Sequence, residues 1–378
     1  MSAAGRVPVA RALAWVDAAT RCLEAEDSAL EKAAGRVLAA DIRAGAAIPP
    51  VDCAAVDGYA LRAEESLGAG AYNPLAVAAT AVELGEPLPP GTDAVVPFDQ
   101  AEPDETGRVV LVEPAAAGAN VDRAGAVAAA GALLVAAGTP LAPRHIGLLA
   151  QSGVASVRVV RRPRVRLVVA GTPRSSQPVD GNAAMLRALV GRDGGTVSEA
   201  LLADVFGGGA DIVLVAGGTG RGQRDRSAAA LSATGSLDIH GVALAPGDTA
   251  GFGHTVEGVA VLLLPGTPVA CLWNYELFAG RAIRRLGGHD GSLFYPSRPA
   301  VAAKKIVSAI GLTEICPIRR LPDGRVEAMA PFAEAGLASA VQGDGFIVVP
   351  ETSEGYPAGA QILAYFYDED RIRAEPAS

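Results

Sequence analysis

Three glycine-bearing loops are the features of this sequence best suited to hold an anion. Each follows an apolar stretch typical of a β-strand: AGTPRSS covers 170–176, AGGTGRG covers 216–222 and PGTP covers 265–268. If the strands are parallel neighbours, the loops share the edge at which open α/β sheets bind ligands. Glycine lets the backbone approach a ligand closely, and the free N–H groups of a following helix attract phosphate. The alternative is that Gly and Pro only end the strands.

Side-chain chemistry near these loops is mostly basic. Four arginines accompany two of the loops: Arg174, Arg221, Arg224 and Arg226. No loop matches GxxxxGK[ST] or GxGxxG, so the sequence does not favour an ordinary nucleotide site. A second candidate is VDCAAVDGYALR at 51–62, in which an Asp-Gly-Tyr turn could present Asp57 to a metal or a substrate. The alternative there is an ordinary Asp-Gly turn.

Length and composition exclude several classes of protein. A chain of 378 residues is too long for one compact core, which predicts two or more domains. A formal net charge of −9 argues against non-specific binding to nucleic acid or to anionic membranes. No apolar run approaches the roughly 18 to 20 residues that span a bilayer, and we recognise no secretory signal. The four cysteines form no CxxC pair, so a reducing cytoplasm is the expected location.

The order of the expected elements predicts an α/β multidomain protein. Apolar residues recur at near-helical spacing over 7–40, which predicts a helix, whereas 75–140 holds short apolar stretches typical of a β-rich insert. From residue 164 the chain alternates strand and helix three times. This order indicates a mostly parallel sheet with helices on both faces. After residue 297 short strands return, which predicts a small C-terminal β domain.

The same segments resemble a known family. They occur in the order found in the MoeA/gephyrin E-domain family: PPVDCAAVDGYALR, GEPLPPGTDAVVPFDQAE, GANVDRAG, GTPLAPRHIGLLAQSGVASVRVVRRPRV, DIVLVAGGTGRGQRD, GVALAPGDTAGFG and LLLPGTPVA. The resemblance covers nearly the whole chain, including PFAEAGLASAVQGDGFIVVP in the tail. Members of this family are molybdopterin molybdenumtransferases, which implies an elongated homodimer that binds molybdopterin or its adenylate. They use molybdate and a divalent cation, typically Mg²⁺, to insert the metal into the dithiolene.

The resemblance also implies domain boundaries and site residues. Domain I would comprise 1–44 and 141–162, a lid-like domain II 45–140, the α/β molybdopterin-binding domain III 163–296, and domain IV 297–378. Asp57 and Asp225 would be the catalytic and metal-binding carboxylates. The implied ligand-binding residues are Gly171, Thr172, Arg174, Asn182, Gly217, Gly218, Thr219, Gly220, Pro246, Gly247, Pro265, Gly266, Thr267 and Pro268.

Several positions depart from the family pattern. The acidic pair of the family's GDEL loop is replaced by Thr172-Pro173, and the lysine-bearing PGKP segment reads APGDT over 245–249. PGNP becomes PGTP at 265–268, and the acidic GED pattern becomes GAV at 125–127. Joining a dianion to a phosphorylated pterin needs cations, and carboxylates hold a hard divalent metal. Backbone N–H groups do not depend on side-chain identity, so ligand binding is expected to survive these changes better than catalysis.

Two leading hypotheses about function remain open, beside a third reading as an unrelated small-anion enzyme that reuses this scaffold. In the first, the protein inserts molybdenum from molybdate into molybdopterin with Asp57 and Asp225 as the surviving carboxylates. In the second, it is a catalytically impaired pterin-binding scaffold or carrier that presents cofactor to a client molybdoenzyme. The replaced acidic and lysine residues favour the second hypothesis, and the intact Gly217-Gly218 pair favours ligand binding in both.

Overall fold

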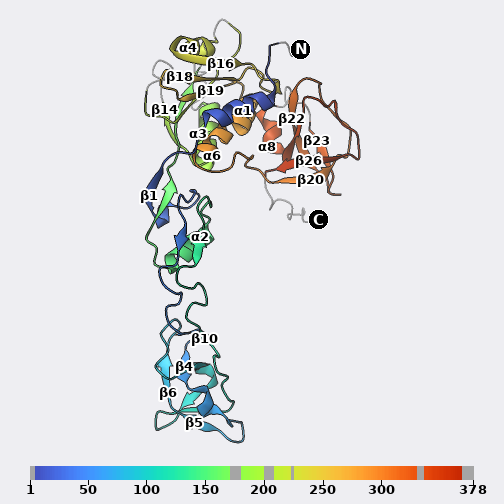
Figure 1. Cartoon of the computed structure of the whole chain (residues 1–378). Coiled ribbons are helices and arrows are strands. Elements are labelled where there is room, and N and C mark those ends of the chain that lie inside the picture. The colour runs from blue at the N-terminus through green and yellow to red at the C-terminus, as the bar shows by residue number, and fades with distance from the viewer. Residues whose placement is uncertain (1–4, 171–179, 200–207, 223–224, 330–335, 368–378) are drawn as a thin grey trace. The chain divides into compact units, whose positions relative to one another are not determined.

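The computed structural model describes residues 5–170, 180–199, 208–222, 225–329 and 336–367. The chain divides into two compact units (Figure 1). The larger unit comprises Met1–Glu26, Gly35–Val37 and Val160–Ser378, and the smaller unit comprises Asp27–Ala34 and Leu38–Val159. Each unit is therefore described by itself.

A six-stranded sheet forms the centre of the larger unit. Its order is β14 (Thr196–Glu199), β13 (Arg164–Val169), β15 (Ile212–Ala216), β19 (Ala260–Leu264), β18 (Gly251–Thr255) and β16 (Gly235–His240). The first four strands are parallel, and β18 and β16 run antiparallel to their neighbours. Every residue of β15 and β19 is buried, as expected for strands covered on both faces. The mostly parallel sheet predicted from the sequence is confirmed.

Helices cover both faces of this sheet. One face packs against α1 (Val9–Ala19), α3 (Gly181–Arg192), α5 (Pro268–Asn274), the π-helical turn Tyr275–Ala279 and α6 (Gly280–Leu286). The other face packs against α4 (Ser227–Thr234), which lies beside β16 and β18 (Figure 1). Leu231 of α4 belongs to a buried cluster that includes Val213 and Val261. The aromatic residues Trp273 and Phe278 are buried on the first of these faces. Successive strand residues alternate between the two cores, as the two-residue period of a strand requires.

The helix expected over 7–40 is only partly correct. Helix α1 ends at Ala19, because Thr20 adopts an extended backbone and its hydroxyl donates to the carbonyl of Val16 at 2.7 Å. Residues Ala25–Ala29 then form strand β1, and Leu30–Lys32 form a single 3₁₀ turn. Val16 belongs to the core of the larger unit, whereas Leu30 and Leu38 belong to a core in the smaller one. The apolar spacing continued by coincidence across two different cores.

The C-terminal strands form a second six-stranded sheet in the larger unit. Its order is β17 (Leu244–Ala245), β22 (Thr313–Arg320), β24 (Gly345–Val349), β26 (Gln361–Phe366) and β20 (Ser297–Val301), with β23 (Val326–Ala328) beside β22. Strands β21 (Ile306–Val307) and β25 (Gly355–Tyr356) pair separately, and α8 spans Leu337–Gln342. Strand β17 comes from the α/β segment and pairs in parallel with β22. A strand of the α/β segment therefore completes the predicted β tail.

The smaller unit is built from short strands, as predicted for 75–140. One three-stranded sheet has the order β6 (Ala79–Val82), β4 (Gly58–Leu61), β7 (Ala94–Pro97), and another has the order β5 (Leu75–Val77), β9 (Val109–Leu111), β8 (Glu102–Pro103). Two strand pairs join β10 (Val121–Asp122) to β3 (Cys53–Ala54) and β11 (Leu133–Val135) to β2 (Ile42–Arg43). Helix α2 (Pro143–Gln151) follows, and β12 spans Ser156–Val160.

Candidate functional site at the carboxyl edge of the central sheet

The loops after β15 and β19 meet at the carboxyl edge of the parallel strands. The backbone N–H of Gly217 donates to the carbonyl of Leu264 at 2.9 Å, and the Ala170 N–H donates to Ala216 at 2.7 Å. The ends of β13, β15 and β19 are thereby joined, as the predicted parallel order requires. The loop after β13, with the predicted site residues Gly171, Thr172 and Arg174, lies outside the described residues, as does Arg224.

Only glycine fits at the first two positions of the GGTG loop. Gly217 and Gly218 have φ angles of 92° and 64°. A Cβ on Gly217 would lie 2.5 Å from the carbonyl oxygen of Ala170, and one on Gly218 would lie 2.8 Å from the hydroxyl of Ser227. That hydroxyl donates to the Gly217 carbonyl at 2.8 Å, and the Ser227 N–H donates to Gly218 at 3.0 Å. The sequence reasoning missed Ser227, which ties this loop to the start of α4.

The PGTP loop is held by the first turn of α3. The side-chain amide of Asn182 donates to the carbonyl of Gly266 at 2.8 Å. Thr267 precedes α5, and Pro268 is its first residue, where a missing N–H costs no hydrogen bond. Asn182 is buried, and its Oδ1 atom has no hydrogen-bond partner within the part of the chain that the structure describes. Asp180 caps α3 by accepting from the Ala183 N–H at 2.9 Å, so that amide is not free for a ligand.

A fourth segment, the APGDT loop over 245–249, joins the same edge. Asn274 donates from its side-chain amide to the Gly247 carbonyl at 3.1 Å and to the Ala270 carbonyl at 2.8 Å. Gly247 has a φ angle of 112°, and a Cβ there would lie 2.1 Å from the Asn274 amide nitrogen. The Ala245–Pro246 peptide bond is cis. Asn274 was not predicted, and a polar residue on an otherwise apolar helix was its only sequence signal.

Two contacts link this fourth segment and its neighbour β16 to the GGTG loop. The hydroxyls of Thr219 and Thr249 lie 3.0 Å apart and share one hydrogen bond. The ring nitrogen Nε2 of His240 lies 2.9 Å from the carbonyl oxygen of Thr219. Because a carbonyl oxygen only accepts, Nε2 carries the proton in this contact. We define the carboxyl rim as residues 217–220, 245–249 and 265–268. No local feature of the sequence indicated that His240 supports this rim.

The two predicted carboxylates belong to different units. In the larger unit, Asp225 folds back over its own loop: its Oδ2 atom accepts from the Gly222 N–H at 2.8 Å and would lie 2.5 Å from a Cβ on Gly220. In the smaller unit, the exposed Asp57 accepts from the Leu84 N–H at 2.7 Å. Each carboxylate therefore organises a local loop. No group of three or more His, Cys, Asp or Glu suited to a metal ion occurs among the described residues.

The rim carries a carboxylate in addition to the arginines that the sequence indicated near these loops. Arg221 and Arg226 are exposed on the loop after β15. Asp248 in the fourth segment forms an ion pair with Arg6, a residue 242 positions away in the chain.

Cys271 on α5 is fully buried, which raises the pKa of its thiol to about 12. The thiol is therefore protonated near neutral pH and acts as a small packing residue.

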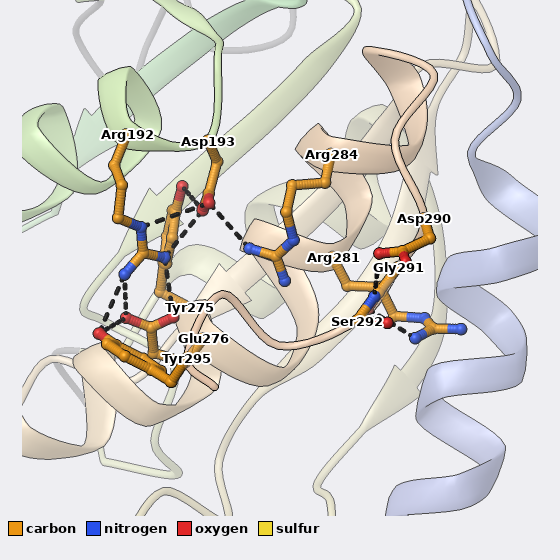
Figure 2. A network of polar contacts seen from close by, with 10 residues as sticks. All are labelled: Arg192, Asp193, Tyr275, Glu276, Arg281, Arg284, Asp290, Gly291, Ser292 and Tyr295. Atoms are coloured by element: carbon orange, nitrogen blue, oxygen red, sulfur yellow. Dashed lines mark hydrogen bonds and ion pairs between the residues drawn. The ribbon is translucent and has the colours of Figure 1, made fainter. Parts of the chain in front are cut away.

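A buried ionic network lies at the other end of α3 (Figure 2). Arg192 donates to both carboxylate oxygens of Glu276 at 2.8 Å, and Arg284 donates to Asp193 at 2.9 Å. The hydroxyl of Tyr295 donates to Glu276 at 2.8 Å. A 12-residue helix is about 18 Å long, so this network is remote from Asn182 and supports the fold rather than the rim.

Comparison with known proteins agrees with this architecture. Residues 7–153 match the family model described as the MoeA N-terminal region (domain I and II), and residues 168–285 match the model described as a probable molybdopterin binding domain. The molybdopterin molybdenumtransferase of Haemophilus influenzae is 30% identical over 315 residues, which cover 75% of this chain and 78% of that protein. Molybdopterin molybdenumtransferase 2 of Mycobacterium tuberculosis is 29% identical over 387 residues, covering 89% of this chain and 93% of that protein.

A solved structure supports the same assignment. The molybdopterin biosynthesis moeA protein from Pyrococcus horikoshii OT3 superimposes with a TM-score of 0.75 at 26% identity, covering 96% of this chain and 100% of that one. The chain therefore belongs to the MoeA family, and several of its matched relatives carry the name molybdopterin molybdenumtransferase. Its mixed α/β multidomain fold agrees with that membership.

Proposed function

We propose that this protein acts in molybdenum cofactor biosynthesis by binding molybdopterin, or its adenylate, at the carboxyl rim. The observation that carries the proposal is that the three rim segments are tied together at one edge of the sheet. The Gly217 N–H donates to Leu264 at the start of the PGTP loop, and Thr219 shares a hydrogen bond with Thr249, two residues after Gly247. The closest neighbours of Gly217 and Gly247 are backbone atoms or amide side chains, so the chain itself forms the surface. Backbone N–H groups at such a glycine-rich edge bind phosphate without any particular side chain.

The buried amide of Asn182 is a candidate for recognition of the pterin. Its nitrogen is occupied by Gly266, and its unpartnered oxygen needs a donor. A buried acceptor without a partner costs about 1–3 kcal/mol, which a pterin N–H group would recover on binding. The remaining ligand-binding residues of the proposal are those of the rim together with Gly171, Thr172 and Arg174.

Insertion of molybdenum from molybdate is the enzymatic form of the proposal. Mg²⁺ is usually held by one or two carboxylates, water and substrate phosphate, and it neutralises phosphate charge. Asp225, which follows the GGTG loop, would supply an oxygen ligand, and Asp57 is the second carboxylate that the family resemblance implies. The second candidate function, a pterin carrier without catalysis, is favoured by one observation: the fourth segment carries Asp248, bound by Arg6, where the family resemblance implies lysine.

The test combines binding and turnover. Isothermal titration of the full chain with molybdopterin should show binding by the wild type and weakened binding by Gly218→Val, since a Cβ there meets Ser227. Gly191→Ala is the matched control, because Gly191 lies on α3 with nothing within 4 Å of an added Cβ. Wild-type affinity in Gly218→Val would move the site away from this loop. With molybdate and Mg²⁺ added, active cofactor above a no-protein blank would overturn the carrier alternative.

The proposed function also implies a location and partners for the protein. None of the helices in the described residues combines the length and apolar content needed to cross a bilayer. We propose a cytoplasmic homodimer that binds small molecules and passes cofactor to a client molybdoenzyme. The net charge of −9 supports the view that neither nucleic acid nor a membrane is its partner.

A further inference from the structure

The ion pair between Arg6 and Asp248 places a residue from the start of the chain at the carboxyl rim. Asp248 lies between Gly247 and Thr249, and its side chain is 32% exposed. The Arg6 side chain is only 13% exposed, so the larger part of the pair is shielded from water. Charges that are partly removed from water interact more strongly than surface pairs. The pair therefore changes the electrostatic potential at the rim.

Backbone contacts fix the segment that carries Arg6. Val7 donates its N–H to the Gly241 carbonyl at 3.0 Å and accepts from the Ala243 N–H at 2.8 Å. The Val242 N–H in turn donates to the Asp248 carbonyl at 3.0 Å. Arg6 and Asp248 are thus held on either side of one short stretch of chain, and α1 begins three residues after Arg6, at Val9.

Asp248 is also adjacent to the contact that joins two parts of the rim. Thr249 shares a hydrogen bond with Thr219 of the GGTG loop at 3.0 Å. A phosphate bound by the backbone of this loop would therefore meet the field of the Asp248 carboxylate. An uncompensated carboxylate repels a phosphate dianion, whereas a neutralised one does not.

We propose that Arg6 determines the ligand charge that the rim accepts: by neutralising Asp248, it lets the site bind a phosphorylated, anionic ligand. This inference rests on the proposed function and adds to it a specificity residue outside the rim. Arg6 is argued to act on the ligand through Asp248, so it is a positioning residue.

A double-mutant cycle with molybdopterin as the probe tests the inference. Arg6→Met keeps the aliphatic stem but removes the charge, and we expect about tenfold weaker binding by titration calorimetry. Asp248→Asn should bind about threefold more tightly than wild type, because the rim then loses the carboxylate that repels phosphate. The double variant should return to within about threefold of wild type, and Arg6→Lys should retain most of the affinity. The deficit of Arg6→Met should shrink as salt rises from 50 to roughly 500 mM.

A purely structural ion pair would behave differently. Both single variants would then weaken binding in proportion to their loss of thermal stability, and the double variant would show no recovery. That result, or an Arg6→Met deficit independent of salt, overturns the inference while leaving the proposed function intact, provided that the wild type binds. Absence of wild-type binding overturns both. Thermal melting of the wild type and the four variants identifies any variant that fails to fold, in which case Asp248→Asn and Arg6→Lys decide the outcome.

Discussion

The guanidinium of Arg192 lies between two buried carboxylates, and its removal should be costly. It donates to Glu276 at 2.8 Å through both terminal nitrogens and to Asp193 at 3.0 Å (Figure 2). Burial lowers the pKa of Arg192, but the bonds and charges of Glu276 and Asp193 outweigh that effect and raise it overall. In Arg192→Met, the Glu276 carboxylate keeps the Tyr295 hydroxyl at 2.8 Å but loses its ionic partner.

The size of the effect follows from burial. Glu276 has a side chain only 1% exposed, so its charge cannot be solvated in place. Removing one partner of a buried ion pair costs about 3–5 kcal/mol. Arg192 is 19% exposed, which admits some water and favours the lower end, about 3 kcal/mol. Asp193 still accepts hydrogen bonds from Arg284 at 2.9 Å and from Tyr275 at 3.0 Å in this variant. The loss of its bond to Arg192 therefore adds little to the cost.

The assay is urea unfolding followed by tryptophan emission. Both tryptophans, Trp15 on α1 and Trp273 on α5, belong to the larger unit, so the signal reports that unit alone. Arg192→Met should lower the free energy of unfolding by about 3 kcal/mol, and Arg192→Met/Glu276→Gln should recover at least about 1 kcal/mol. Molybdopterin affinity should be unchanged where the variant is folded. The reasoning is refuted if Arg192→Met lowers the free energy of unfolding by less than about 1 kcal/mol. It is also refuted if the double variant loses as much as the sum of the losses of the two single variants.

Three further outcomes follow from local geometry. Gly217→Ala should destabilise the larger unit by about 2–3 kcal/mol in urea unfolding, because its φ angle is 92° and the new Cβ would lie 2.5 Å from the Ala170 carbonyl oxygen. A loss below about 0.5 kcal/mol would contradict the rigidity assigned to this turn. Burial lowers the pKa of His289, so the unfolded chain takes up the proton first, and stability should fall as pH drops below about 6.5. In thermal melts between pH 8 and 5, His289→Asn should show a shallower decline than the wild type, and parallel curves would exclude this origin. Of the four free thiols, Cys22 is exposed and the others are buried. The native protein should therefore react with one equivalent of Ellman's reagent and the unfolded protein with four. Rapid reaction of more than one thiol in the native protein would contradict the burial of the other three.

Much of the central architecture was predictable because its signals are local. Strands β15 and β19 are continuous apolar runs bounded by glycine, which is the pattern of a parallel strand buried on both faces. The paired glycines at 217–218 were recognisable for the same reason: the turn requires φ angles that only glycine adopts readily. The ordered motifs also identified the family, which the comparisons bear out.

The helix predicted over 7–40 shows where local signals fail. Its apolar spacing is real, but Val16 and Leu38 face different cores, and the chain leaves the helix at Thr20. Periodicity records which residues are buried and carries no information about what they are buried against. The parallel pairing of β17 with β22 was invisible for a related reason, since a two-residue strand has no period to detect.

The sequence by itself determined the alternation of strands and helices around the central sheet and the glycines on which the rim depends, because these features have signals within short stretches of the chain. Tertiary structure alone decided the contacts across the rim: His240 with Thr219, Asn274 with Gly247, and Arg6 with Asp248. These partners are separated by 21, 27 and 242 positions. Their contacts depend on the path of the whole chain, and that path is set by the burial of two cores on opposite faces of one sheet.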